Sequence, residues 1–295
     1  MMNLKLNLMT PRLSIYKRTM STYVEPNATY IFIDGSYYCF HRYYSVINWW
    51  NMVFNREPLE NPYENQIFLE KFKQTFLETI TTMPAKLNIN TNVIPKIIVG
   101  KDCKRENIWR MELFNKYKGT RIKKDGFMGK PFFSMAYEEQ LFEKAGAERV
   151  LYHPKLEADD CIAITVKHLI KETPNCNIYI ITSDRDYLQL NAPNVKIFNL
   201  AYKNIAEDKT TCQEALRDLQ IKILSGDISD NIPSVFPKCG PKTAIKCIED
   251  PEFFKTKMNE NEDYYKQYEK NKILIDFDNI PDHLVNEFKL VNHLL

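Results

Sequence analysis

The chain has 295 residues, of which 44% are hydrophobic and 26% are charged. This composition is typical of one large or two small globular domains, and the low glycine count of 8 excludes a fibrous or low-complexity protein. The formal net charge of +2 excludes nothing, but its distribution is uneven. Residues 96–130 carry 11 Lys or Arg against 4 Asp or Glu, a surplus that fits a polyanionic partner and equally a solvated surface.

Seven cysteines are scattered without a CxxC pair, so we expect free thiols and a reducing, intracellular compartment. No run of 18 apolar residues is present, so we expect no membrane span. The first 24 residues are basic and contain no acid. They fit a mitochondrial targeting segment, a disordered tail, or an upstream start before a second one at Met20.

Short apolar runs alternate with helical patterns in the first two thirds of the chain. We predict strands at 30–34, 95–99, 177–182 and 195–198 and helices at 62–82 and 157–171. Aromatic residues at 37–50 have near-helical spacing, which is typical of a core or an interface and less often of base stacking. Strands that alternate with helices predict an α/β fold with a mostly parallel, twisted sheet flanked by helices.

Lysines, arginines and aromatic residues are interleaved at 104–145. We predict two helices there, with a break between Gly126 and Pro131. Such a segment can bind backbone phosphates and stack exposed bases.

An acid follows each of three successive predicted strands, at Asp34, Asp102 and Asp184. Ligands of open α/β sheets bind outside the carboxyl ends of the strands. Aspartate is also a common turn residue, which explains one or two of these positions but not all three.

The densest acidic stretch is LEADD and its continuation through TSDRD. Its acids are Glu157, Asp159, Asp160, Asp184 and Asp186. The first three open a predicted helix, where the helix dipole favours anions. Like charges held close repel one another, and Mg²⁺ or Mn²⁺ neutralises a site made only of oxygen ligands. The stretch therefore predicts a divalent metal site.

The pattern becomes helical after Thr211, with a helix at 212–224, an acidic turn at 226–233 and a glycine turn that opens a helix ending at Ile248. A proline just inside that helix start is favourable. Backbone amides at such a hairpin bind phosphates without reading bases. Residues 251–295 are expected to be helical and to carry no site.

Six elements in this order resemble the flap endonuclease/5′-nuclease superfamily, which includes the 5′-nuclease domains of bacterial DNA polymerases and the phage 5′-exonucleases. The elements are IDGS at 33–36, RMELFNKYKGTR at 110–121 after Asp102, LEADD at 156–160, TSDRD at 182–186, LSGDISDNIP at 224–233 and CGPKTA at 239–244. The resemblance implies a PIN-like nuclease domain at 28–205 with a helical arch at about 104–145. It implies a helix-hairpin-helix region with C-terminal helices at 206–295, and leaves 1–27 as a tail or targeting segment.

The resemblance also implies the site. Two Mg²⁺ or Mn²⁺ ions, about 4 Å apart, would be held by Asp34, Asp102, Glu157 and Asp159 at the first ion and Asp184, Asp186 and Asp230 at the second, with Asp160 and Asp227 acting partly through waters. The cations expected to neutralise the scissile phosphate are Lys118, Arg121 and, one or two helical turns earlier, Arg110. Tyr117 is expected to stack a base near the cut. The expected DNA contacts of the hairpin are Lys238, Gly240, Lys242 and Thr243.

The hairpin departs from the family pattern GxGPK, because Lys238 replaces the first glycine and the loop reads one residue longer. This departure puts a potassium ion at the hairpin in doubt but leaves amide contacts from Gly240 onward. No QxxLxxFF-type sliding-clamp motif follows residue 250, and we expect a monomer.

The expected function is metal-dependent hydrolysis of DNA at a 5′ flap, a nick or a free 5′ end, or of an RNA primer in an RNA–DNA hybrid, in replication or repair. The alternatives are a plain 5′-3′ exonuclease without flap preference, a PIN-type ribonuclease and a catalytically inactive protein that binds branched DNA. A PIN-type ribonuclease would lack the acidic turn and the hairpin, and an inactive member would be expected to lose carboxylates. The nucleus or cytoplasm, a viral replication site and the mitochondrion all remain open.

Overall fold

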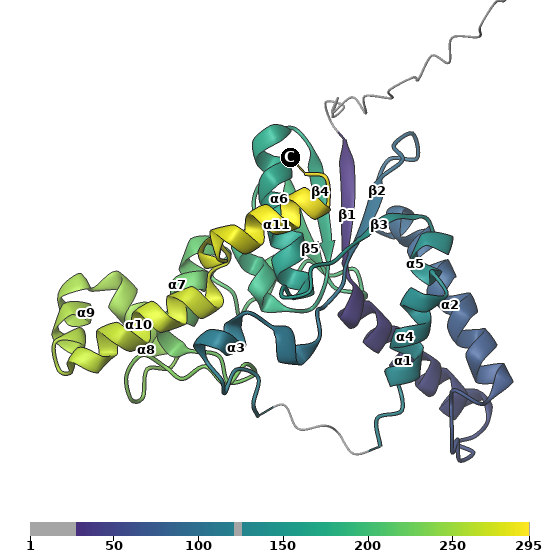
Figure 1. Ribbon diagram of the computed structural model, residues 1–295, viewed down its shortest axis with the longest axis horizontal. Coiled ribbons are helices and arrows are strands. Elements are labelled where there is room, and N and C mark those ends of the chain that lie inside the picture. Colours follow the sequence, from purple (N-terminus) through teal and green to yellow (C-terminus); the bar gives the residue numbers. More distant parts are fainter. Residues whose placement is uncertain (1–27, 121–125, 295) are drawn as a thin grey trace, which may run out of the picture.

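The computed structural model describes residues 28–120 and 126–294 (Figure 1). Within these residues the centre is a five-stranded sheet in the order β3-β2-β1-β4-β5, and every neighbouring pair is parallel. The strands are β1 (Thr29–Asp34), β2 (Lys96–Gly100), β3 (Ala147–Leu151), β4 (Asn177–Ile181) and β5 (Val195–Phe198). The prediction of a parallel α/β sheet flanked by helices is confirmed.

One face of the sheet is covered by α1 (Gly35–Val53), α2 (Gln66–Lys86), α4 (Lys130–Glu138) and α5 (Leu141–Lys144). Side chains of a strand alternate between faces, and Ile31 and Ile33 of β1 pack on this side against Phe72 and Phe76 of α2. The aromatic residues of α1 are mainly core, since Tyr38 and Trp50 are buried in the same cluster.

The other face is covered by α6 (Ala158–Glu172) and α11 (Asp282–Val291). Tyr30 and Phe32 of β1 point to this side and join Ile162 of α6 and Phe288 of α11 in one hydrophobic cluster. The start of α6 is thereby fixed against the middle of the sheet, beside the carboxyl ends of β1 and β2.

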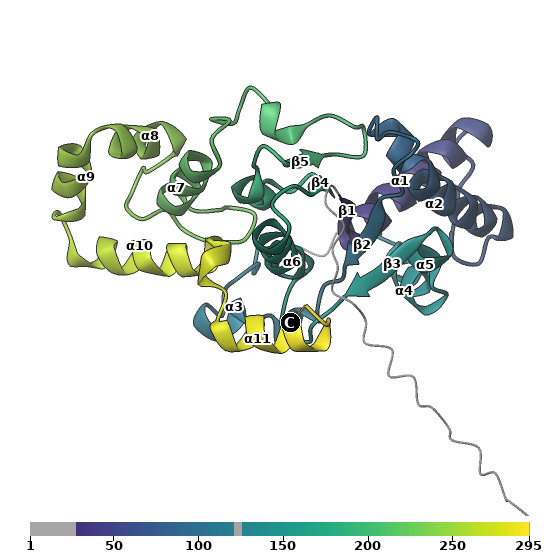
Figure 2. The ribbon, with the colours of Figure 1, turned by 90° about the horizontal axis from the view of Figure 1, so that it is seen from above.

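The remaining helices, α7 (Ala215–Ser225), α8 (Pro241–Glu249), α9 (Pro251–Met258) and α10 (Glu262–Ile275), lie at the end of the molecule opposite α1 and α2 (Figures 1 and 2). They enclose a separate cluster that includes Phe236, Cys247 and Met258. The amide of the buried Asn271 in α10 donates to the carbonyls of Ile223 and Pro233, at 2.9 and 2.8 Å, and ties α10 to α7 and the acidic turn.

The segment 104–145 differs from the prediction of two helices. In the described residues 104–120 the structure has only a 3₁₀ turn (Arg105–Asn107) and the one-turn helix α3 (Arg110–Leu113), which ends because Phe114 is extended. The side chains of Trp109 and Arg110 reach buried partners in α6, so tertiary contacts outweigh local helical spacing.

Two smaller differences have equally local causes. Strand β3 was not predicted, because it is an edge strand in which Glu148 is exposed and no apolar run is visible. Helix α2 begins at Gln66 and not at residue 62, because the Asn65 side chain caps it by accepting from the Phe68 amide. Further 3₁₀ helices are Arg185–Leu190, Ile205–Glu207 and Phe277–Asn279.

All seven cysteines are free, as expected. Across 28–120 and 126–294, we find no helix with the length and apolar character needed to span a bilayer. The expected tail at 1–27 and Arg121 lie outside the described residues.

Candidate active site

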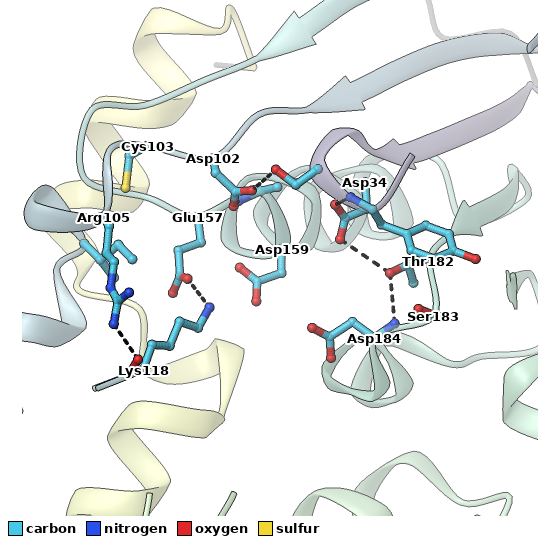
Figure 3. A pocket seen from close by; sticks show the side chains of 14 residues that line it. Asp34, Asp102, Cys103, Arg105, Lys118, Glu157, Asp159, Thr182, Ser183 and Asp184 are labelled. Carbon is cyan, nitrogen blue, oxygen red and sulfur yellow. Dashed lines mark hydrogen bonds and ion pairs between the residues drawn. The ribbon is translucent and has the colours of Figure 1, made fainter. Parts of the chain in front are cut away.

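Three acids that follow strands meet at one edge of the sheet. Because β2, β1 and β4 are adjacent and parallel, Asp34, Asp102 and Asp184 all lie at their carboxyl ends. They line a cavity of about 460 Å³ together with Glu157 and Asp159 from the start of α6 (Figure 3). The sequence prediction that these acids converge is therefore supported by the geometry.

The carboxylates at the strand ends are oriented by hydrogen bonds. Asp34 caps α1 by accepting from the Tyr37 amide at 3.0 Å. Asp102 accepts from the Ala158 amide at 2.8 Å and from the Ser36 hydroxyl. The hydrogen bond from the Ala158 amide links the end of β2 to the first turn of α6, so Asp102 has a fixed position relative to Asp159.

The acids of α6 divide into those that face the cavity and one that lies behind it. Carboxylate oxygens of Glu157, Asp159 and Asp160 lie within 4.8 Å of one another. The buried Asp160, however, accepts from the Trp109 indole at 3.0 Å and from two nitrogens of Arg110 at 2.8 and 2.7 Å. Its oxygens are therefore occupied by protein donors.

A second acidic group lies beyond Asp184. Oxygens of Asp186, Asp227 and Asp230 also lie within 4.8 Å of one another. Asp186 and Asp227 of this group border a larger hollow of about 870 Å³ that extends past Asp184 to Gly240 of the hairpin. Seven of the nine predicted acids thus line the two hollows, and Asp160 and Asp230 belong to the acidic groups beside them.

Lys222 of α7 is a site residue that the sequence analysis missed. Its ammonium pairs with Asp186 and lies 2.7 Å from Asp227. Burial raises the pKa of Asp227, but the charge and hydrogen bond of Lys222 and the hydrogen bonds from Ser229 together outweigh burial and lower that pKa to about 2. The available signal was a lysine five residues before Asp227 in the last turn of a predicted helix.

Four acids of the first cavity have pKa values that are raised, in contrast to Asp227. Burial, followed by the charge on Asp102, raises the pKa of Asp34 to about 7. Burial is also the main cause that raises the pKa values of Glu157, Asp159 and Asp184. Carboxylates that are costly to ionise together fit a divalent cation with oxygen ligands.

Lys118 enters the first cavity from the basic segment. Its ammonium pairs with Glu157 (Figure 3). The same ammonium lies 3.9 Å from Oδ2 of Asp230. Arg105 also lines this cavity and donates to the backbone carbonyl of Lys118. The sequence analysis counted Arg105 only as part of the basic segment.

Arg110 and Tyr117 lie elsewhere than expected. The Arg110 side chain is 2% exposed and donates to Asp160 and Glu157. The Tyr117 ring is buried, and its hydroxyl oxygen lies 3.0 Å from Glu157 and 2.9 Å from Asp230, so one proton is shared between two carboxylates. The expectation that these two side chains touch the substrate is corrected, because both are enclosed and hold carboxylates in place.

The hairpin presents its expected residues at the surface. Lys238, Gly240 and Lys242 are exposed and Thr243 is half-buried, and a Cβ added to Gly240 would meet open space. Lys238 has a φ of 61°, the left-handed conformation that favours glycine, which agrees with its place in the glycine pattern. Its carbonyl accepts from the Gly240 amide at 3.0 Å.

Known proteins resemble this chain over most of its length. The family model described as "5'-3' exonuclease, N-terminal resolvase-like domain" matches residues 29–224. A protein named Ribonuclease H from Enterobacteria phage T4 is 30% identical over 283 residues, covering 80% of this chain and 88% of that protein. A 5′-3′ exonuclease of Buchnera aphidicola subsp. Acyrthosiphon pisum is 29% identical over 261 residues, covering 84% of this chain and 77% of that protein.

Solved structures share the fold. The bacteriophage T5 D15 flap endonuclease, in a complex with DNA and metal ions, aligns with a TM-score of 0.60 and 18% identity. The alignment covers 90% of this chain and 98% of that chain. The likeness therefore extends over both the sheet and the C-terminal helices.

Replacing Arg110 by methionine should destabilise the fold. Asp160 would keep a buried charge without its main partner, which typically costs roughly 3–5 kcal/mol. Urea unfolding measures the loss, and Arg217→Met is the matched control because the Arg217–Glu249 pair is partly exposed and should contribute about 1 kcal/mol or less. An Arg110→Met variant as stable as the wild type would contradict this role.

The metal-free protein should become less stable as the pH rises from about 4 to about 7. Asp34 has a raised pKa in the folded state, so the folded protein binds its proton more tightly than the unfolded chain does, and that stabilisation is lost through this window. In EDTA, Tm should fall by several degrees between about pH 4 and about pH 7, since about 1 kcal/mol shifts Tm by roughly 2–4 °C in a protein of this size.

Added Mg²⁺ should remove most of that fall, because a cation favours the ionised carboxylates, and Asp34→Asn should reduce the slope without metal. A Tm in EDTA that is constant or rises over this window would count against the pKa of Asp34.

Proposed function

The chain belongs to the 5′-3′ exonuclease family, and from this premise we propose that it cleaves DNA at 5′ flaps, nicks or free 5′ ends in replication or repair. Family membership makes it a metal-dependent 5′-nuclease, a phosphodiester hydrolase. The proposal is that DNA with these 5′ structures is the substrate, and one observation carries it. Two acidic groups at the edge of the sheet lie beside a hollow that leads to an exposed hairpin.

We assign two Mg²⁺ or Mn²⁺ ions to these groups. The residues that would hold them are Asp34, Asp102, Glu157 and Asp159 in the first group and Asp184, Asp186, Asp227 and Asp230 in the second. Asp160 is withdrawn as a ligand because Trp109 and Arg110 occupy its oxygens. Such ions, when bound, lower the pKa of a water molecule and stabilise charge on the leaving oxygen.

The protein's own residues position the substrate. Lys118 lines the first cavity together with Arg105, and the Lys118 ammonium would neutralise charge on the scissile phosphate. The exposed start of α8 at Gly240 and the side chains of Lys238, Lys242 and Thr243 would bind phosphates of the adjoining duplex without reading bases. Arg121 keeps its proposed role at the phosphate as an expectation from the resemblance.

A second candidate substrate is the RNA strand of an RNA–DNA hybrid, supported by a 30% identical relative that carries the name Ribonuclease H. A PIN-type ribonuclease is disfavoured by the acidic turn and the hairpin, and an inactive DNA-binding protein by the retention of all nine acids. A monomer remains our proposal. A reducing compartment also remains one, supported by seven free cysteines.

Asp186→Asn should abolish cleavage but preserve binding in Ca²⁺. Losing a ligand that stabilises transition-state charge by several kcal/mol lowers turnover about 10³-fold. A gel assay with 5′-flap, nicked, single-stranded and RNA-primed duplexes measures cleavage and ranks the substrates, while fluorescence anisotropy measures binding. Asp263→Asn, which changes an exposed carboxylate paired with Lys266, is the control. Near-wild-type turnover of Asp186→Asn would remove the metal assignment.

Lys118→Ala should slow the chemical step far more than it weakens binding. Removing one preorganised donor from a developing charge typically costs about 10²–10³-fold in rate. Single-turnover cleavage in Mg²⁺ and anisotropy in Ca²⁺ separate the two effects. Equal losses in rate and affinity would mean that Lys118 only binds the substrate through its charge and does not act in the chemical step.

A further inference from the structure

The turn that carries Lys118 rests on the turn that carries the second acidic group. We call Lys116–Gly119 the cation turn and Gly226–Pro233 the acidic turn. The Lys118 amide donates to the carbonyl of Asp230 at 2.8 Å. The Asn231 side-chain amide donates to the carbonyl of Lys116, also at 2.8 Å, across 115 residues of sequence.

The backbone of the cation turn depends on such support. Lys118 has a φ of 54°, a left-handed conformation that is uncommon for residues other than glycine and costs about 1–3 kcal/mol. Its amide is held by Asp230 and its carbonyl by Arg105, so it is fixed from two sides. The direction of the Lys118 side chain follows from this conformation.

Asn231 contacts the turn at its closing point. The Lys116 carbonyl accepts from the Gly119 amide at 2.8 Å, which closes the turn, and from Asn231. A Cβ added to Gly119 would lie 3.5 Å from the Asn231 amide nitrogen and 2.8 Å from the Lys116 oxygen, so the two turns are closely fitted. Asn231 itself lies near the end of the acidic turn and has a φ of 60°, which is a left-handed backbone conformation.

We propose that Asn231 is a positioning residue: its bond to the Lys116 carbonyl fixes the cation turn and thereby places the Lys118 ammonium between Glu157 and Asp230. The hydrogen bond between Asn231 and Lys116 then fixes the position of Lys118 in the first cavity relative to the second acidic group. This inference rests on the proposed function, in which Lys118 acts on the scissile phosphate. It adds a residue that does not touch the substrate and acts through Lys118.

The test is a double-mutant cycle between Asn231→Gly and Lys118→Ala. Glycine tolerates the left-handed backbone of the acidic turn and removes the side chain that carries the amide donor. We expect single-turnover cleavage of a 5′-flap duplex to slow about 10–100-fold, as misplacement of a catalytic group does. Binding in Ca²⁺ should change less than threefold. In a Lys118→Ala background, Asn231→Gly should slow cleavage no further.

Two further variants keep the result interpretable. Asn231→Asp preserves shape but replaces the donor by an acceptor, and it should lose at least as much rate as the glycine variant. Asn55→Gly changes an exposed asparagine that is also left-handed, at the far end of α1, and it should cleave like the wild type.

Three outcomes would overturn the inference: additive losses in the cycle, a wild-type rate for Asn231→Gly, and an equal loss of binding. A wild-type chain that cleaves none of the substrates would overturn the proposed function itself. The same gel assay therefore distinguishes failure of the proposed function from failure of the inference about Asn231.

Discussion

Repulsion among carboxylates at the edge of the sheet is the constraint around which this protein is built. Asp34, Asp102 and Asp184 cannot avoid one another, because three adjacent parallel strands end side by side. The N-terminus of α6 adds Glu157 and Asp159, and burial raises the cost of ionising them together. A fold that keeps such a group must supply positive charge, and the surrounding segments do so.

Internal cations compensate only part of this charge, and each does so in a different way. Arg110 is buried and holds Asp160 in a two-nitrogen pair, so that acid becomes structural. Lys118 reaches the cavity but stays partly accessible, which leaves it able to meet a phosphate. Lys222 pairs with two acids of the second group and, with Ser229, lowers the pKa of Asp227, whereas burial and the charge on Asp102 raise the pKa of Asp34. The accessible remainder of the negative charge is what a divalent cation would bind.

The sequence was sufficient for features that depend on neighbours in the chain. Apolar runs and helical spacing predicted four of the five strands in the described residues, and acids after three of them predicted the site edge. Strand β3 escaped because an edge strand with an exposed Glu148 has no apolar pattern. The short helix α3 escaped because Trp109 and Arg110 are fixed by contacts with Asp160, about fifty residues further along the chain.

By itself, then, the sequence predicted the parallel α/β fold, the family and the nine candidate acids, because the alternation of strands with helices, turn chemistry and charge are written in local patterns. Only the tertiary structure decided which of those acids face a cavity and which are already neutralised. It turned Asp160, Arg110 and Tyr117 from expected site groups into supports, and it brought Lys222, Arg105 and Asn231 to the site. Those assignments depend on distances between segments far apart in the chain, and no local pattern records such distances.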